Sequence, residues 1–225
     1  LNIVAVDNNP ERTENVRRTL DATGLYGSRV IVDCIDAPKM PYPDYFANLI
    51  VSESLLTEGA VEPDDDLLRM LKPHGGILCL GYPSEASNQG QPLSQEALLK
   101  RCESLEDFTA GSISDNGRWI KVSRGTLAGE GKWTHEYADL GNTACSDDQR
   151  VKGQLGVLWY GRPGPELMVE RHSRPAAPVA MDGRMFIQGE NVIMAYDAYN
   201  GTFLWKTDIP GALRVRVDSD MGNLA

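Results

Sequence analysis

The chain has 225 residues, of which 41% are hydrophobic and 24% charged, and its formal net charge is −10. The apolar share excludes a generally disordered chain, and an acidic surface repels phosphate backbones, so we do not expect nucleic acid as a partner. We expect no membrane span, because no apolar run reaches ~18–20 residues. The protein is expected to be soluble, cytoplasmic or periplasmic, and its four cysteines, with no Cys-x-x-Cys pair, predict no metal site.

The first predicted elements are a strand and a helix. The run "NIVAV" (2–6) is apolar throughout, which is typical of a parallel strand covered on both faces. Asn8 or Asn9 can cap the helix that follows, and Pro10 suits its first position. Asp7 ends the strand at the edge where open α/β sheets bind ligands, and a carboxylate can accept hydrogen bonds from both hydroxyls of a ribose. A turn or helix-capping role for Asp7 is the alternative.

Strands and helices continue to alternate up to residue 123. Further strands are expected at 28–36, 47–54, 75–83 and 118–125, and further helices at 63–73 and 94–105. This alternation implies right-handed crossovers and a parallel sheet. Cys34 and Cys79 fall within these strands, and we expect both to be buried as small apolar residues.

The second half of the sequence is rich in glycine, aromatic residues and short strands. A strand is expected at 156–161, and hairpins at 178–188 and 191–211, which turn at Asp182-Gly183 and at Ala198–Gly201. Antiparallel strands in succession predict a meander, and strands of this length recur in propeller blades.

The change of composition predicts two domains. The first covers residues 1–123 and the second residues 124–225, with a glycine-rich linker at 125–132. The first residue is Leu, so we expect the chain to be a processed protein or a piece of a longer one.

Residues 1–123 resemble class I S-adenosylmethionine-dependent methyltransferases. "VAVD" followed by "NNPERTENVRRTL" is similar to their second strand and helix, and "LLRMLKPHGGILCLG" (67–81) is similar to their leucine-rich helix, turn and fifth strand, with His74 where glycine is common. The resemblance implies S-adenosylmethionine (SAM) as the cofactor, with Asp7 at the ribose. The positions that match the family's cofactor contacts are Asp7 and Asn8 after the second strand, Asp36 and Ala37 after the third, and Ser52 and Glu53 after the fourth.

The family's first strand and its Gly-x-Gly-x-Gly loop have no counterpart in these residues. That strand lies between the second and fourth strands, so we expect a gap of about twice the ~4.8 Å strand spacing. Each unmet buried backbone group would cost roughly 1–3 kcal/mol. We therefore expect shifted pairing, a strand borrowed from a partner or through self-association, or local unfolding. Because the cofactor loop is missing, we expect this chain alone to be inactive.

The stretch "IMAYDAYNGTFLWKTDIPG" (193–211) resembles the PQQ-like repeat of quinoprotein-type β-propellers. The matching residues are Ala195, Asp197, Gly201 and Trp205. Glycine permits the tight turn, aspartate can accept hydrogen bonds from turn amides, and tryptophan offers a flat packing surface. The resemblance implies about two of the ~4–8 blades of a propeller. We expect these to serve as a protein-binding scaffold and do not expect bound PQQ.

We therefore predict an incomplete α/β, Rossmann-like methyltransferase sheet followed by an all-β, propeller-like antiparallel meander. The leading function is SAM-dependent methylation, with the propeller as a binding module; the methyl acceptor and the catalytic residues cannot be assigned. Two alternatives stay open. In the first alternative, the chain is a non-catalytic scaffold with a relic Rossmann-like domain. In the second, it is part of a quinone-dependent oxidoreductase.

Overall fold

The computed structural model describes residues 1–36, 39–52, 65–81, 100, 107–113, 119–162, 167–168 and 176–212. It divides into two units, Leu1–Tyr42 and Pro43–Ala225. The boundary predicted after residue 123 falls within the second unit and stays a prediction.

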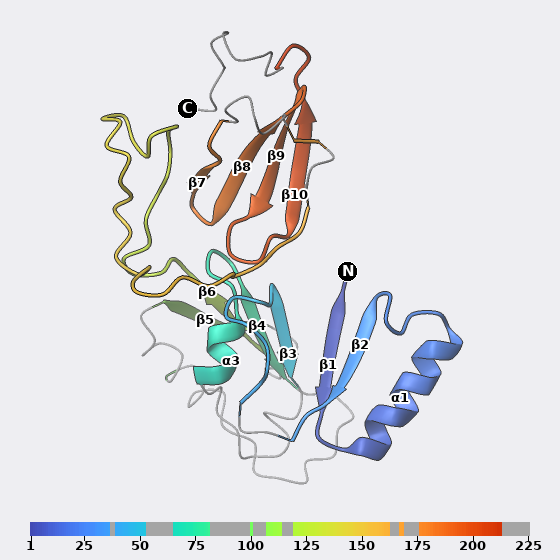
Figure 1. Ribbon diagram of the computed structural model, residues 1–225. Helices are drawn as coiled ribbons and strands as arrows, with labels where there is room; N and C mark the ends of the chain where they lie inside the picture. Colours follow the sequence, from blue (N-terminus) through green and yellow to red (C-terminus); the bar gives the residue numbers. More distant parts are fainter. Residues whose placement is uncertain are drawn as a thin grey trace. The chain divides into compact units, whose positions relative to one another are not determined.

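The first unit is a strand–helix–strand element (Figure 1) made of β1 (Ile3–Asp7), α1 (Pro10–Ala22) and β2 (Val30–Cys34). The two strands are parallel, with Asp7 opposite Cys34 in the register. Arg17 ties α1 to β2, because its Nε and Nη2 donate hydrogen bonds of 2.9 and 2.7 Å to the Val32 carbonyl. The predicted parallel strand–helix–strand order is confirmed here.

The start of α1 follows the predicted capping chemistry. Asn9 is the N-cap, and its Oδ1 accepts a 2.9 Å hydrogen bond from the Arg12 amide. Pro10 occupies the first helical position, where no amide hydrogen is needed. Cys34 was expected to be buried but is exposed, because β2 lies in a sheet that has two strands among the described residues.

The second unit contains a mixed sheet in the order β3–β4–β6–β5. Its elements are β3 (Leu49–Ser52), α3 (Asp65–Met70), β4 (Ile77–Gly81), β5 (Phe108–Ile113) and β6 (Trp119–Arg124). β3 and β4 are parallel, whereas β6 runs antiparallel to both β4 and β5. The strands expected at 47–54, 75–83 and 118–125 are confirmed. The helix expected at 94–105 lies, apart from residue 100, outside the described residues.

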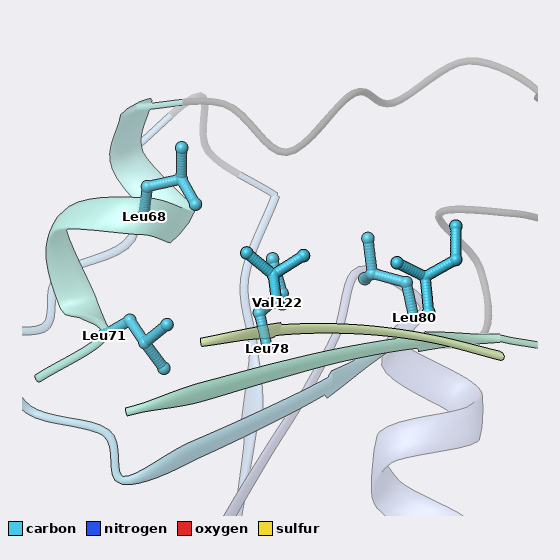
Figure 2. Close-up of a cluster of buried hydrophobic side chains, with 6 residues drawn as sticks. Leu68, Leu71, Leu78, Leu80 and Val122 are labelled. Atoms are coloured by element: carbon cyan, nitrogen blue, oxygen red, sulfur yellow. The ribbon is translucent and has the colours of Figure 1, made fainter. Parts of the chain in front are cut away.

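One face of this sheet carries the main core, shown in Figure 2. Register places Leu78 opposite Val122 and Leu80 opposite Ile120, so these side chains share a face, and the leucines from α3 and its C-terminal end cover them. Leu71, Leu78, Leu80 and Val122 are fully buried. Complete burial of each such side chain contributes about 1.5–3 kcal/mol.

The other sheet of the second unit is the predicted meander. β7 (Val179–Met181), β8 (Arg184–Gly189), β9 (Val192–Asp197) and β10 (Phe203–Asp208) are all antiparallel and lie side by side in this order (Figure 1). Both predicted hairpins are confirmed.

The propeller prediction holds only in a coarser form. Within the residues that the structure describes, the meander is a single four-stranded sheet, the size of one blade, and a closed propeller is not formed. The strand expected at 156–161 is wrong: these residues have irregular backbone. Trp159 there donates a 2.9 Å hydrogen bond from Nε1 to the Ala198 carbonyl, so it serves the β9–β10 turn and not a strand of its own.

Candidate functional site

The carboxyl end of β1 carries the first predicted site residue, Asp7. Its Oδ1 accepts a 2.8 Å hydrogen bond from the Asn9 amide, and its Oδ2 lies 3.0 Å from Arg12 Nη1. The Asp7 side chain is 25% exposed and that of Arg12 66% exposed. Each carboxylate oxygen has two lone pairs, so both oxygens keep acceptor capacity toward solvent while they organise the entry to α1. The turn-forming role, the alternative reading of Asp7, is therefore present in the structure.

Asn8 and Asp36 lie at the same edge of the first unit as Asp7. β1 and β2 are parallel, and the Ile35 amide donates a 3.0 Å hydrogen bond to the Asp7 carbonyl, so the chain past β2 leaves beside the end of β1. Asn8 and Asp36 are both exposed. Ala37 lies outside the described residues. Three polar residues predicted as cofactor contacts thus share one strand edge.

The remaining predicted positions, Ser52 and Glu53, belong to the second unit. Ser52 is the last residue of β3, stands opposite Leu80 and is partly buried. Glu53 lies outside the described residues. Ser52 therefore stands at the carboxyl edge of its own parallel strand pair, which is where ligands meet open α/β sheets.

β1 and β3 both lie at the edge of a sheet in the described part of the chain. Among the described residues, β1 pairs only with β2, and β3 pairs only with β4. Side chains on both strands are exposed although their sequences are those of buried strands: Ile3 is 44% exposed, and Leu49 and Val51 are each 55% exposed. The resemblance implies that its missing first strand would pair with these two strands, and this stays a prediction.

A second polar cluster was not predicted. Lys72 Nζ lies 2.5 Å from Asp197 Oδ2, across 125 residues of sequence. Asp197 is 3% exposed, and the side chain of Lys72 is 13% exposed. A buried carboxylate is costly without a partner, so each charge makes the burial of the other possible.

A hydrogen-bonded triad adjoins this ion pair. His74 Nε2 lies 2.7 Å from Glu130 Oε1, and the Tyr199 hydroxyl donates a 2.7 Å hydrogen bond to Glu130 Oε2. Burial alone would raise the pKa of Glu130, but hydrogen bonds from Tyr199, from the Leu127 amide and from His74 outweigh it, so that pKa is lowered. Burial and the bond to Glu130 raise the pKa of Tyr199. At neutral pH the triad therefore contains a carboxylate and a neutral phenol.

The two polar regions of the second unit lie at opposite ends of β3 and β4. Lys72 and His74 belong to the turn that precedes β4, and Asn48, which precedes β3, accepts a 3.1 Å hydrogen bond from Asn200 Nδ2. These positions mark the amino edge of the strands, whereas Ser52 marks the carboxyl edge. The meander therefore contacts the sheet away from the candidate ligand edge.

The sequence predicted only one part of this cluster, the hydrogen bonds of Asp197 to its turn. Asp197 was expected to accept hydrogen bonds from turn amides, and its Oδ1 does so, at 3.0 Å from the Tyr199 amide and 3.2 Å from the Asn200 amide. Lys72 and His74 fall within the stretch 67–81 that resembles the methyltransferase turn, but the resemblance assigns no contact to either residue. Their position just before a buried strand was the one signal that they could meet another part of the chain.

Two further features concern the residues that the structure describes. No group of three or more His, Cys, Asp or Glu side chains there could hold a metal ion. None of the helices in the described ranges is long and apolar enough to cross a membrane.

Comparisons with known proteins give distant structural similarity. No protein-family model matches the chain, and no curated protein matches it. Among solved structures, the chain is similar to the [4+2]-cyclase SpnF, with 25% identity and a TM-score of 0.40 over 52% of this chain and 47% of the cyclase. It is also similar to a SAM-dependent methyltransferase from Aquifex aeolicus, with 20% identity and a TM-score of 0.43 over 55% of this chain and 68% of that one. The first match spans about half of the cyclase chain. Both TM-scores lie below 0.5, so neither similarity establishes a shared fold.

Proposed function

We propose that the chain carries part of a SAM-binding, methyltransferase-like α/β domain, joined to a β-meander that serves as a binding module. The observation that carries this proposal is the shared edge of β1 and β2, where Asp7, Asn8 and Asp36 gather at the carboxyl ends of two parallel strands. The parallel β3–β4 pair, with Ser52 at its carboxyl end, gives further support.

The proposed roles follow from the chemistry of adenosine. Asp7 would accept hydrogen bonds from the ribose hydroxyls on the lone pairs that Asn9 and Arg12 leave open. Arg12 is exposed and can swing aside, so the ion pair does not block a ligand. Asp36 and Ala37 would lie beside the adenine, and Ser52 and Glu53 beside the methyl donor, as the resemblance implies. When bound, SAM supplies an activated methyl group.

Calorimetric titration of the chain with SAM tests this proposal. We expect weak saturable binding that Asp7→Asn weakens by about tenfold or more, which is the scale of a lost hydrogen bond to a charged group. Asp21→Asn is the matched control, because Asp21 is an exposed carboxylate on α1. Absence of saturable binding, or equal affinity of the Asp7 and Asp21 variants, would contradict the proposal.

A second candidate is a non-catalytic scaffold, and one observation favours it. β10 begins with three consecutive apolar residues whose side chains are exposed, with Phe203 51%, Leu204 40% and Trp205 43% exposed. Large exposed apolar residues that lie close together are typical of protein-binding surfaces. If SAM does not bind and a photo-reactive group at Leu204 cross-links a defined protein that the same group at exposed Lys152 does not, the scaffold function is favoured.

A further inference from the structure

The turn between β9 and β10 is engaged on every side by the rest of its unit. Asn200 and Thr202 both contact Asn48 Oδ1, at 3.1 and 3.4 Å. The Tyr199 ring meets the Tyr45 ring edge-on, with 5.1 Å between centroids. Gly201 has φ +70 and packs against Trp159, whose ring an added Cβ at this position would strike. These contacts fix the position of the turn against the rest of the second unit.

His74 adds backbone strain to this contact region. Its φ is +53, in the left-handed region that costs an L-residue roughly 1–2 kcal/mol. The resemblance has glycine at this place, which would adopt the same backbone without strain. Strained residues persist where the surroundings over-determine them. Here the ring of His74 is fixed by Glu130 and lies against the backbone of Gly183, where an added Cβ would meet the His74 side chain at 2.7 Å.

The two hairpin turns of the meander are themselves linked. The Ala198 amide donates a 2.9 Å hydrogen bond to the Gly183 carbonyl. On the other side, the His74 and Gly75 amides donate 2.8 Å hydrogen bonds to the Gly125 and Arg124 carbonyls, at the end of β6. Backbone hydrogen bonds thus tie each partner of the contact firmly to its own sheet.

We propose that the turn before β4 and the turn between β9 and β10 form a joint. Through this joint, the β3–β4–β6–β5 sheet and the meander open for amide exchange together, as one cooperative unit. The joint comprises Lys72 and His74 on one side, Asp197 and Tyr199 on the other, and Glu130 between them. Its centre is the Lys72–Asp197 ion pair, and the strained His74 is kept because its ring completes the contact. Local opening of the meander is then accompanied by opening at the amino ends of β3 and β4. This inference does not depend on the proposed ligand.

Hydrogen–deuterium exchange of the full chain with His74→Gly distinguishes two explanations, because they predict opposite changes in the rate of amide exchange. If His74 is merely strained, glycine relieves the strain and slows amide exchange in β4. If the joint holds, loss of the ring speeds exchange by about tenfold in both β4 and β9, since sub-global opening of a cooperative unit exposes all its parts together. Faster exchange in β4 alone, or slower or unchanged exchange in either strand, would overturn the proposal.

Milder variants keep the proposal testable if His74→Gly does not fold. Tyr199→Phe removes only the hydroxyl that donates to Glu130, and we expect exchange about threefold faster in both strands. Gly183→Ala places a methyl group against His74 at φ +71, whereas Gly211→Ala, at φ +88 with no atom within 4 Å, adds the same kind of strain without that contact. The joint predicts that Gly183→Ala speeds exchange in β4 and that Gly211→Ala does not. Equal effects of both glycine variants on β4 would overturn it.

Discussion

The first and second units contain apolar strands of similar sequence that are buried to very different extents. "IVAVD" in β1 and "ILCLG" in β4 are both apolar runs of the kind found in covered parallel strands. In β4, Leu78 and Leu80 are completely buried, whereas in the first unit Ile3 is 44% and Ile31 46% exposed. The difference lies in the partners: β4 has a strand on each side and α3 over one face, while β1 has one neighbouring strand in the part of the chain that the structure describes. A strand sequence therefore indicates the environment it suits, and exposed apolar residues on such a strand mark a sheet that lacks a partner.

The strongest test of this contrast is a pair of core truncations. Leu78→Ala should destabilise the second unit by about 2–5 kcal/mol, because it leaves a cavity in the cluster of Figure 2. Ile31→Ala should cost less than about 1 kcal/mol, since its side chain is half-exposed already. Denaturant unfolding measures both: tryptophan fluorescence follows the second unit, which holds all four tryptophans, and far-ultraviolet dichroism follows α1. Equal losses would show that the two strands are equally buried in solution.

Two arginines that join a helix to a strand allow a second test. Arg124 is 9% exposed, and its Nη1 donates hydrogen bonds of 2.9 and 2.6 Å to the Leu68 and Leu71 carbonyls at the end of α3. Arg17 ties α1 to β2 in a similar way but is less buried. Arg124→Met should cost about 1–3 kcal/mol, because it leaves buried carbonyls without donors.

Arg17→Met should cost about half as much as Arg124→Met, since water can reach the freed Val32 carbonyl more easily. Thermal unfolding compares the two variants. A larger loss for Arg17→Met would contradict the view that the first unit is the less enclosed one.

We also expect the edge strand β3 to promote self-association of the chain in solution. β3 carries no charged residue, and such apolar edges promote association with other strands. Val51→Lys should weaken concentration-dependent self-association by about tenfold, which corresponds to about 1.4 kcal/mol. Sedimentation velocity measures it, with Leu140→Lys as a control at a loop position that is 86% exposed. If both variants behave alike, the edge of β3 is not an association surface.

The smallest expected effect concerns acid sensitivity in the second unit. Because the pKa of Glu130 lies below its ordinary value of 4.5, the charged carboxylate stabilises the folded state above that pH, and this contribution is lost as the pH falls through the lowered pKa. Glu130→Gln should therefore cost about 0.5–1.5 kcal/mol at pH 7, and the difference from the parent should shrink as the pH falls from about 5 to 3. Fluorescence-detected unfolding across this range checks it; a constant difference would exclude the ionised carboxylate as the cause.

Local chemistry made part of this fold predictable. Asn9 and Pro10 determine where α1 begins, and the Asp182-Gly183 and Asp197–Gly201 turns determine the two hairpins, because each depends on neighbours within a few residues. β5 was missed, since its "FTAGSI" contains the weak strand formers alanine, glycine and serine and is stabilised by pairing with β6. The 156–161 segment was wrongly predicted as a strand because its aromatic residues suit a strand, whereas Trp159 packs over a turn.

Less can be said of the candidate site. Asp7 was predicted from its place at the end of an apolar run, and Asn8, Asp36 and Ser52 from the family resemblance. All four lie at or just after strand ends, and their role as cofactor contacts stays a prediction. The Lys72–Asp197 pair could not be found in this way, because a contact across 125 residues depends on how two sheets meet and not on any local pattern.

The placement of the joint has a consequence for how such a chain can evolve. The meander is held at the amino edge of β3 and β4, whereas Ser52 and Gly81 end these strands at the opposite, carboxyl edge. Substitutions at Ser52 and Gly81 can therefore alter the carboxyl edge while the attachment of the meander at the amino edge stays intact. Selection could therefore diversify the chemistry at one end of the sheet and conserve the attached module at the other, each at its own pace.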